Sequence, residues 1–140
     1  MDLTVANQYL DAHGQGVLAT LKRDGRPQLS NVMYSAKDGL VRISVTAERA
    51  KARNATRDPR VSLHVTAPDF WSYLVVEGDA ELTPEAGESA ETLAELRELY
   101  RLMSGGEHED WDDYDRAMVA DRRQVLHLRV AHAYGMVPPA

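Results

Sequence analysis

The amino-acid sequence predicts a mainly β (α+β) domain, a small antiparallel barrel of six strands with flanking helices. Three observations support this prediction. Six segments alternate apolar and polar residues with the two-residue period of a strand. Tight-turn signals separate the first three of these segments, and one long segment has the apolar stripe of an amphipathic helix. A chain of 140 residues, 44% hydrophobic and 27% charged, is sized for a single domain over residues 1–140.

The chain begins with a predicted helix over residues 3–14. Leu3, Ala6 and Leu10 recur at helical spacing, and Gly14 is a suitable stop. This helix precedes all six predicted strands.

The first three strands are joined by two predicted hairpins. Residues 16–22 and 27–36 flank the sequence "RDGRP", in which Gly25 can take the positive φ of a tight turn. Pro27 is tolerated where a strand begins. The sequence "KDG" then leads into a third strand, residues 40–46.

A short helix and two strands follow. Residues 48–57 are rich in alanine and end before Pro59, which predicts a helix. Strands are predicted over residues 60–67 and 71–83, and Gly78 within the second indicates a bulge or bend.

The C-terminal part predicts two helices and the sixth strand. Residues 86–103 carry one leucine-rich stripe and stop at a glycine pair, so we expect this helix to cap the barrel. A short helix is expected over residues 112–120 and the last strand over residues 124–135.

Charge is unevenly distributed in a chain whose formal net charge is -6. Residues 77–115 contain fourteen Asp and Glu but only two Arg, a distribution that repels a nucleic-acid backbone. Zero cysteines excludes disulfides and thiolate metal sites. No stretch is apolar enough for a membrane span and no signal-peptide pattern is present, so we expect a cytoplasmic protein without membrane or nucleic-acid partners.

The basic window "RAKARNATRDPR", residues 49–60, contains five cations and one acid. On a helix, Arg49, Arg53 and Arg57 share one face at a spacing of four residues. Arg49 and Lys51 fall in the first turn, where unpaired N–H groups and the helix dipole favour an anion. These features predict a small anion site, and the alternative is a set of solvated arginines.

Three motifs resemble a known family. They are "GVLATLKRDGRPQLSNVMY", "RAKARNATRDPRVSLHV" and "WSYLVVEGDAELT", and the closing "AYG" agrees with them. Together, across residues 16–134, they resemble the pyridoxamine 5'-phosphate oxidase-like split-barrel family. The resemblance is greatest to its actinobacterial branch of reductases that depend on coenzyme F420, a deazaflavin.

This resemblance implies a homodimer of FMN-binding-type split β-barrels, with a cofactor site shared between the two subunits. Arg49 and Lys51 would hold the cofactor phosphate, and Trp71 and Tyr73 would reach the cofactor from the second subunit. The other implied cofactor-binding residues lie on two strands and the basic helix. They are Gln28, Ser30 and Asn31 along the ring, Val45 and Thr46 beside it, and Ala50 and Asn54 on the helix.

The implied function is that of an F420-dependent oxidoreductase. A deazaflavin carries hydride, so the substrate would be an unsaturated small molecule such as an enone, quinone or tetrapyrrole. Arg53 and Arg57 are candidates for contacts with the anionic cofactor tail or with acids on the partner chain. The alternatives are an FMN-dependent oxidase or reductase of the same fold, and a non-catalytic cofactor or haem binder.

No catalytic side chain and no metal site are predicted. Tyr34 and Tyr73 are candidate proton donors, although packing as a half-buried residue is the better explanation for either tyrosine. The sequence "HEDWDDYD", residues 108–115, lacks the spacing of a calcium loop and is better explained as an acidic helix start.

Overall fold

The computed structural model describes residues 1–138, which form four helices and eight strands. The helices are α1 (Leu3–Asp11), α2 (Ala50–Arg57), α3 (Ala90–Ser104) and α4 (Trp111–Ala120). The strands are β1 (Gln15–Leu21), β2 (Pro27–Met33), β3 (Ser35–Lys37), β4 (Leu40–Thr46), β5 (Arg60–Thr66), β6 (Tyr73–Leu82), β7 (Arg123–Arg129) and β8 (His132–Met136).

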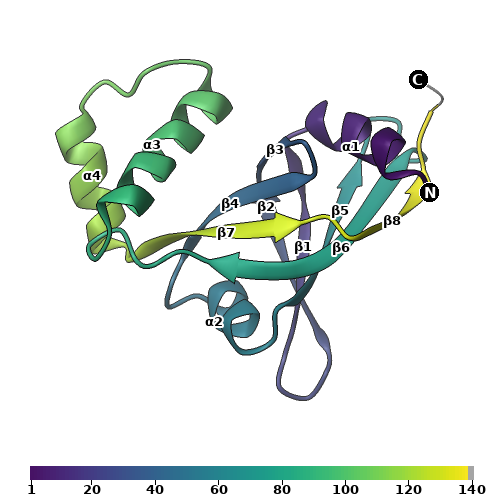
Figure 1. Cartoon of the computed structure of the whole chain (residues 1–140), viewed down its shortest axis with the longest axis horizontal. Helices are drawn as coiled ribbons and strands as arrows, with labels where there is room; N and C mark the ends of the chain where they lie inside the picture. Colours follow the sequence, from purple (N-terminus) through teal and green to yellow (C-terminus); the bar gives the residue numbers. More distant parts are fainter. Residues whose placement is uncertain (139–140) are drawn as a thin grey trace.

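All strand pairs are antiparallel and form one curled sheet, in the order β2-β1-β5-β6-β7-β4-β3. Strand β6 is long enough to pair along one edge with two partners, β8 over Tyr73–Glu77 and β7 over Ala80–Leu82. The bend predicted at Gly78 falls between these two segments. Figure 1 shows the sheet curling around the core, with α3 and α4 together at one end.

The six strands predicted from the sequence correspond to eight in the structure. Two of the predicted strands each break into two, β2 with β3 and β7 with β8. The first break is at Tyr34, whose N–H bonds the carbonyl of Gly14 and whose hydroxyl bonds the carbonyl of Leu10. At the second break, the N–H groups of Val130 and Ala131 leave the ladder and bond loop and strand carbonyls elsewhere. At both sites, tertiary hydrogen bonds replace the regular pairing.

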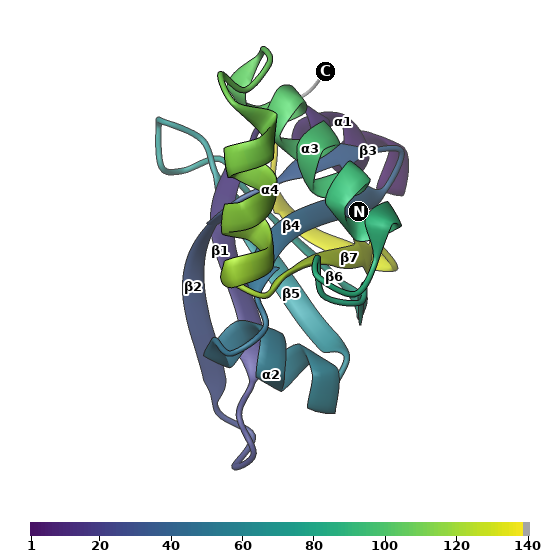
Figure 2. The ribbon, with the colours of Figure 1, turned by 90° about the vertical axis from the view of Figure 1, so that its left-hand side faces the viewer.

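The barrel interior is filled by inward-facing aliphatic side chains from β1, β4, β5, β6 and β7, including Leu18, Ile43, Leu63, Leu74 and Leu126, all at most 1% exposed. Helix α2 packs across one end of this core and contacts β1, β2, β4 and β6. In Figure 2 it lies in the lower part of the molecule, beside the hairpin of β1 and β2. The basic window is therefore attached to the barrel itself.

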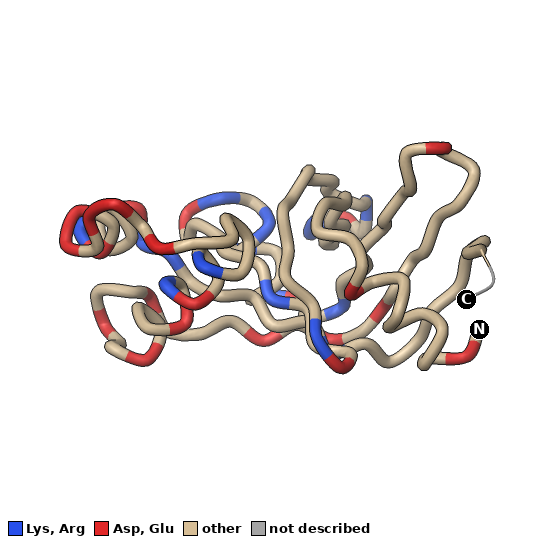
Figure 3. Tube along the Cα trace, turned by 90° about the horizontal axis from the view of Figure 1, so that it is seen from above, with Lys and Arg blue, Asp and Glu red and all other residues tan. Residues whose placement is uncertain are grey.

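Helices α3 and α4 form a hairpin on the outer face of β4 and β7, around a second apolar cluster that includes Leu96, Leu99 and Val125. Helix α3 begins at Ala90, four residues later than its predicted start, because the side chain of Ser89 caps its first turn. Acidic residues gather at this end of the molecule (Figure 3). Within residues 1–138, no helix has the length and apolar character needed to cross a bilayer.

Candidate functional site

The barrel is open along one seam. Strand β2 pairs only with β1, and the second half of β4 pairs only with β7, because β3 covers β4 no further than Leu40–Arg42. Strands β2 and β3 are nearly continuous in sequence, so β2 and residues 43–46 diverge from a common point at Tyr34. We call these two unpaired edges the seam.

On the β4 side of the seam, Ile43 and Val45 are at most 1% exposed, whereas Ser44 and Thr46 are half-buried. Alternate residues of β2 are exposed on the other side, so a ligand in the seam would meet β2, Ser44 and Thr46.

Helix α2 brings cations to the end of the seam. It starts directly after β4, and its N-cap residue, Arg49, makes no side-chain capping hydrogen bond. Among the residues described, no ion pair includes Arg49, Lys51 or Arg53, although the acids outnumber the bases in the chain. This end of the seam therefore has a local excess of positive charge and unpaired helix N–H groups, which together favour an anion.

Lys51 does not extend into bulk solvent. Its side chain is half-buried, and burial together with the nearby charges of Arg49 and Arg123 lowers its pKa from the ordinary value of 10.5. Arg123 reaches this cluster from β7, because the register of the sheet places it opposite Thr46. An anion bound here would relieve the mutual repulsion of three cations.

The two remaining arginines of the basic window are used within the chain. Arg57 donates to the backbone carbonyl of Leu21 and, at 3.2 Å, to the side-chain oxygen of Asn54. Arg60 forms an ion pair with Asp58 at 2.8 Å, and this pair holds the pKa of the Asp58 carboxyl at about 2. The predicted face of three arginines is thus divided, with Arg53 exposed and Arg57 bound to β1.

A buried hydrogen-bond chain attaches the basic helix to the barrel. The amide of Asn54 donates to the hydroxyl of Thr20 at 3.2 Å, and that hydroxyl donates to Gln28 at 2.9 Å. Gln28 in turn donates to the hydroxyl of Ser30 at 2.8 Å. Three residues predicted as cofactor contacts, Gln28, Ser30 and Asn54, are therefore brought together, and their contacts hold α2 in place.

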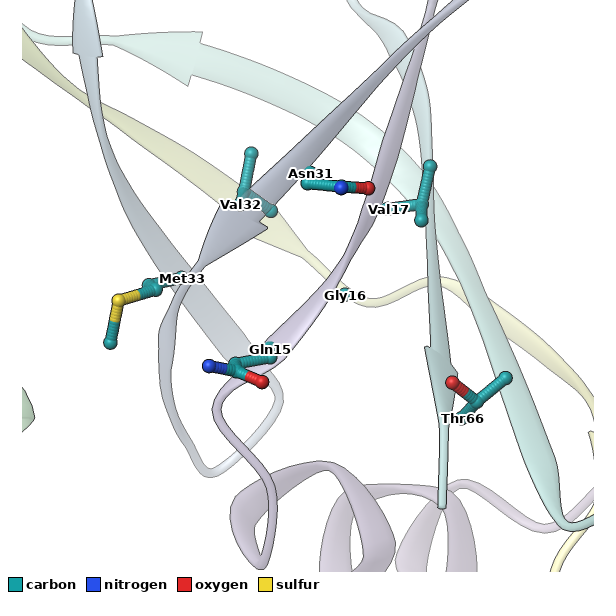
Figure 4. A pocket seen from close by; sticks show the side chains of 7 residues that line it. All are labelled: Gln15, Gly16, Val17, Asn31, Val32, Met33 and Thr66. Atoms are coloured by element: carbon teal, nitrogen blue, oxygen red, sulfur yellow. The ribbon is translucent and has the colours of Figure 1, made fainter. Parts of the chain in front are cut away.

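Asn31 lies on the opposite face of β2 from Gln28 and Ser30. Strand alternation turns it outward, next to Val17 on β1, as Figure 4 shows. Asn31 and Val17 help to line a depression of about 440 Å³ on the outer face of the sheet. The three strand residues predicted to follow one ring are thus split between two faces.

The predicted residues at the end of β4 differ in their exposure. Val45 is fully buried in the core, backbone included, so the structure leaves none of its surface open to a ligand. Thr46 is half-buried at the end of the strand, and Ala50 is exposed at the first turn of α2. These three positions border the seam where it reaches the cation cluster.

Trp71 and Tyr73 lie at the start of β6, whereas the end of the basic helix lies at the other end of that strand, where the N–H of Ala80 donates to the carbonyl of Pro59. Trp71 is 77% exposed in the loop before β6 and stacks edge-on against Phe70 at 5.3 Å. Tyr73 packs against His64 at 5.7 Å, and these four side chains help to line a cavity of about 340 Å³. Phe70 adopts a φ of 71°, an uncommon value for a bulky residue.

The outer face of the sheet is strongly apolar for an exposed surface. Register places one row of outward side chains across five strands, and that row is Asn31, Val17, His64, Val75 and Tyr134. Large apolar residues surround the row and remain exposed, and they are Leu29, Met33, Phe70, Trp71 and Met136. Exposed large apolar residues are therefore concentrated on this face of the sheet.

Two sequence-based alternatives are resolved by packing. Tyr34 is 2% exposed, donates to Leu10, and has its pKa raised by burial, so it is a packing residue and a poor proton donor. The acidic sequence before α4 forms a helix start, because the side chain of Asp110 accepts from the N–H of Asp113.

Thr20, Ser44 and Arg123 belong to the site although no local sequence pattern marks them. Thr20 is the buried centre of the hydrogen-bond chain, and Arg123 donates to the hydroxyl of Ser44 at 3.4 Å. The Nε of Arg123 is buried without a hydrogen-bond partner, although Asp121 lies 3.5 Å from it. Only the pairing of β4 with β7 could have placed Arg123 near the basic window.

These residues suit a flat cofactor with an anionic end. The edge of β2 together with Ser44 and Thr46 offers polar groups for a ring, and three clustered cations can take a phosphate.

Comparison with known proteins gives one matching family model, described as pyridoxamine 5'-phosphate oxidase, over residues 4–136. Among solved structures, a conserved hypothetical protein from Mycobacterium tuberculosis is 23% identical, with 98% of this chain and 85% of that chain covered and a TM-score of 0.77. An F420 reductase is 25% identical over 86% of this chain and 89% of that chain, with a TM-score of 0.66.

A haem-binding protein from Mycobacterium smegmatis is also similar. It is 27% identical over 94% of this chain, with a TM-score of 0.66. This chain spans 52% of that protein. The similar structures therefore include both a reductase and a ligand-binding protein.

Proposed function

Because the chain belongs to the pyridoxamine 5'-phosphate oxidase family, we propose that it is an oxidoreductase that binds coenzyme F420 along the seam. It would reduce an unsaturated small molecule. The reduced deazaflavin supplies a hydride when bound, and the protein orients it and excludes water.

One observation carries the proposal, the cation cluster at the end of the seam. Arg49 and Lys51 would hold the cofactor phosphate at the N-terminus of α2, with Arg123 adding to the positive field. Thr46 and Ala50 would border the ring where it meets the phosphate site. Gln28, Ser30 and Asn54 keep α2 and β2 at a fixed separation.

We further propose that the protein is a homodimer whose two sites are each built from both subunits. The exposed apolar face supports this, since a second copy would cover Leu29, Met33 and Met136. Trp71, which is 77% exposed on an outward loop, would then reach the cofactor of the partner subunit. Asn31 and Tyr73, on the same outer face, would belong to that shared part of the site.

F420 is preferred to FMN because of the number of cations without an acid partner. FMN ends in a single phosphate, whereas the deazaflavin carries a phosphodiester and an oligoglutamate tail. Arg53, exposed on α2, is available to that tail. The similarity to an F420 reductase at 25% identity supports the same choice.

A non-catalytic haem-binding role is the second candidate, and it is favoured by the similarity to the haem-binding protein at 27% identity. The two candidates predict different ligands. A haem site gains iron–protein coordination from a side chain such as histidine, whereas the F420 site uses the cations of α2.

The test is a titration of the purified full chain with F420, FMN and haem, followed by fluorescence quenching or absorbance. We expect saturable binding of F420 that is at least tenfold tighter than that of FMN. We also expect no flavin colour in protein made in a host without F420. Preferential FMN binding would reassign the cofactor, and binding of haem alone would replace the reductase proposal with the second candidate.

A further inference from the structure

Arg122 occupies the turn between α4 and β7 and has an uncommon backbone conformation. Helix α4 ends with Asp121 as its C-cap, and the next residue, Arg122, has a φ of 55°. This left-handed position after a helix is usually filled by glycine or asparagine, because a larger side chain is strained there. An arginine in this conformation points to a role for its side chain that offsets the strain.

The guanidinium of Arg122 joins two acids from separate segments of the chain. It donates to both carboxylate oxygens of Glu85, at 2.8 and 3.0 Å. Its Nη1 donates to the carboxylate of Glu48 at 3.0 Å, and its backbone carbonyl accepts from the N–H of Ala47 at 3.0 Å. The bidentate pair with Glu85 fixes the plane of the guanidinium, so that Nη1 is held toward the turn between β4 and α2.

Glu48 is the acid nearest in sequence to the cations at the start of α2. It directly precedes Arg49, the N-cap residue, and the first turn of α2 contains no acid. The unpaired N–H groups of that turn and the charges of Arg49 and Lys51 attract a carboxylate for the same reason that they attract a phosphate. A free Glu48 side chain would therefore compete with a bound anion from within the chain.

The ion pair with Arg122 holds Glu48, because burial does not. The side chain of Glu48 is 67% exposed, and that of Arg122 is 49% exposed. An exposed pair of this kind adds little to the stability of a protein. Its effect here is to fix the position of one negative charge beside the anion site.

We propose that Arg122 is a positioning residue for the anion site, which it keeps open by holding the carboxylate of Glu48 away from Arg49 and Lys51. This role rests on the proposed function, in which that site takes the cofactor phosphate. Arg122 does not meet the phosphate itself, because Nε, Nη1 and Nη2 each donate to a carboxylate.

Inorganic phosphate is the probe, because it tests the anion site without a cofactor. The full chain, labelled with 15N, is titrated with phosphate at constant pH and ionic strength. The backbone amide signals of Lys51 and Ala52, in the first turn of α2, report binding. Arg122→Asn is the main variant, since asparagine tolerates the left-handed conformation but is too short to bridge the two acids.

Two double variants separate the position of Glu48 from net charge. Arg122→Asn with Glu48→Gln and Arg122→Asn with Glu85→Gln both have the formal charge of the wild type, but only the first removes the competing carboxylate. Arg116→Asn, which removes a 70% exposed arginine of α4, is the control for the loss of one surface charge.

We expect Arg122→Asn to weaken phosphate binding roughly fivefold or more, and Arg116→Asn to bind like the wild type. Without phosphate, the Lys51 and Ala52 signals of Arg122→Asn should already lie closer to their phosphate-bound positions, because the freed carboxylate occupies the site. Adding Glu48→Gln should restore both the signals and the affinity, whereas adding Glu85→Gln should restore neither. A purely structural role for Arg122 would not produce this selective rescue.

An unchanged affinity in Arg122→Asn, no rescue by Glu48→Gln, or equal rescue by both glutamine substitutions overturns the role of Arg122. If Arg122→Asn does not fold, Arg122→Gly, which removes the backbone strain, replaces it in the same comparison. A wild type that binds phosphate but not F420 would refute the F420 proposal, while the phosphate titrations would still decide the role of Arg122. A wild type that binds neither would refute the anion site and the role of Arg122 with it.

Discussion

The side-chain amide of Asn54 donates a hydrogen bond to the hydroxyl of Thr20 at 3.2 Å, in a place where Thr20 is fully buried and Asn54 is 8% exposed. This contact joins the basic helix to β1. It explains why a polar residue occupies the buried face of α2, and why the cations on the other faces are held at a fixed position.

Removing this contact should destabilise the fold. Thr20→Val keeps the shape of the side chain but leaves the amide of Asn54 and the side chain of Gln28 without a shared partner. A buried polar group left unpaired costs about 1–3 kcal/mol of unfolding free energy. Urea unfolding measures this loss, and Arg53→Ala, on the exposed face of the same helix, is the control expected to stay near wild type. Equal stabilities for the two variants would refute the role of this contact.

Lys51→Ala should weaken cofactor binding by about 1.5–3 kcal/mol, the usual contribution of a hydrogen bond to a charged group. Isothermal titration calorimetry with F420 measures the change. Lys22→Ala, an exposed lysine in the hairpin between β1 and β2, should leave the dissociation constant unchanged. If both variants bind like the wild type, the cations of α2 are solvated charges without a ligand.

Cofactor binding should take up a proton at alkaline pH. Burial and the charges of Arg49 and Arg123 lower the pKa of Lys51 below 10.5, and a bound phosphate would raise it again. The affinity should therefore fall as the pH rises through the lowered pKa of the free protein. Calorimetry in two buffers with different ionisation enthalpies measures the uptake, which Lys51→Ala should abolish.

The same shift has an opposite effect on the stability of the free protein. The unfolded chain, with its higher Lys51 pKa, binds more protons than the folded chain between the two pKa values, so stability should rise with pH in that window. A rise in affinity over the same window would contradict the phosphate site.

Mixed dimers test whether each site uses both subunits. Lys51→Ala and Trp71→Ala should each weaken F420 binding. If Lys51 comes from one subunit and Trp71 from its partner, a heterodimer of the two variants has one site with both residues intact. Random pairing should then restore about a quarter of the sites to wild-type affinity. If mixing restores no wild-type sites, Lys51 and Trp71 do not come from different subunits. Either both residues then belong to one subunit's site, or neither contributes to a site.

Local patterns were sufficient for most of the fold. Alternation along residues 40–46 and 60–67 and the Asp-Gly turn at Gly25 depend on neighbouring residues, and the structure confirms these elements. The break at Tyr34 was missed because a buried tyrosine fits a strand pattern. Only its contacts with Leu10 and Gly14, which are distant in sequence, show that the strand ends there.

The site was predictable only in part. The basic window is a local signal, and the half-buried position of Lys51 agrees with a role beyond solvation. Arg123 joins it only through the register that pairs Thr46 with Arg123. The separation of Asn31 from Ser30 follows from strand alternation, which the family resemblance alone did not take into account. Pairing between distant strands therefore decides which candidate residues meet.

Gly78→Ala should disrupt the bend in β6 that lets one edge of this strand pair first with β8 and then with β7. A Cβ at this position would overlap the carbonyl oxygen of Arg129 and press on the side chain of Leu128. Because β6 leaves β8 and joins β7 here, the backbone cannot move away without breaking one of the two pairings. Overpacking of this kind costs about 1–3 kcal/mol, and the obstacle here is backbone, so we expect a loss at the upper end. Gly106→Ala, where a Cβ meets no atom within 4 Å, is the matched control and should change the unfolding free energy by about 0.5 kcal/mol or less. Thermal and urea unfolding of the two variants measure the difference, and equal stability would show that β6 bends without requiring a glycine.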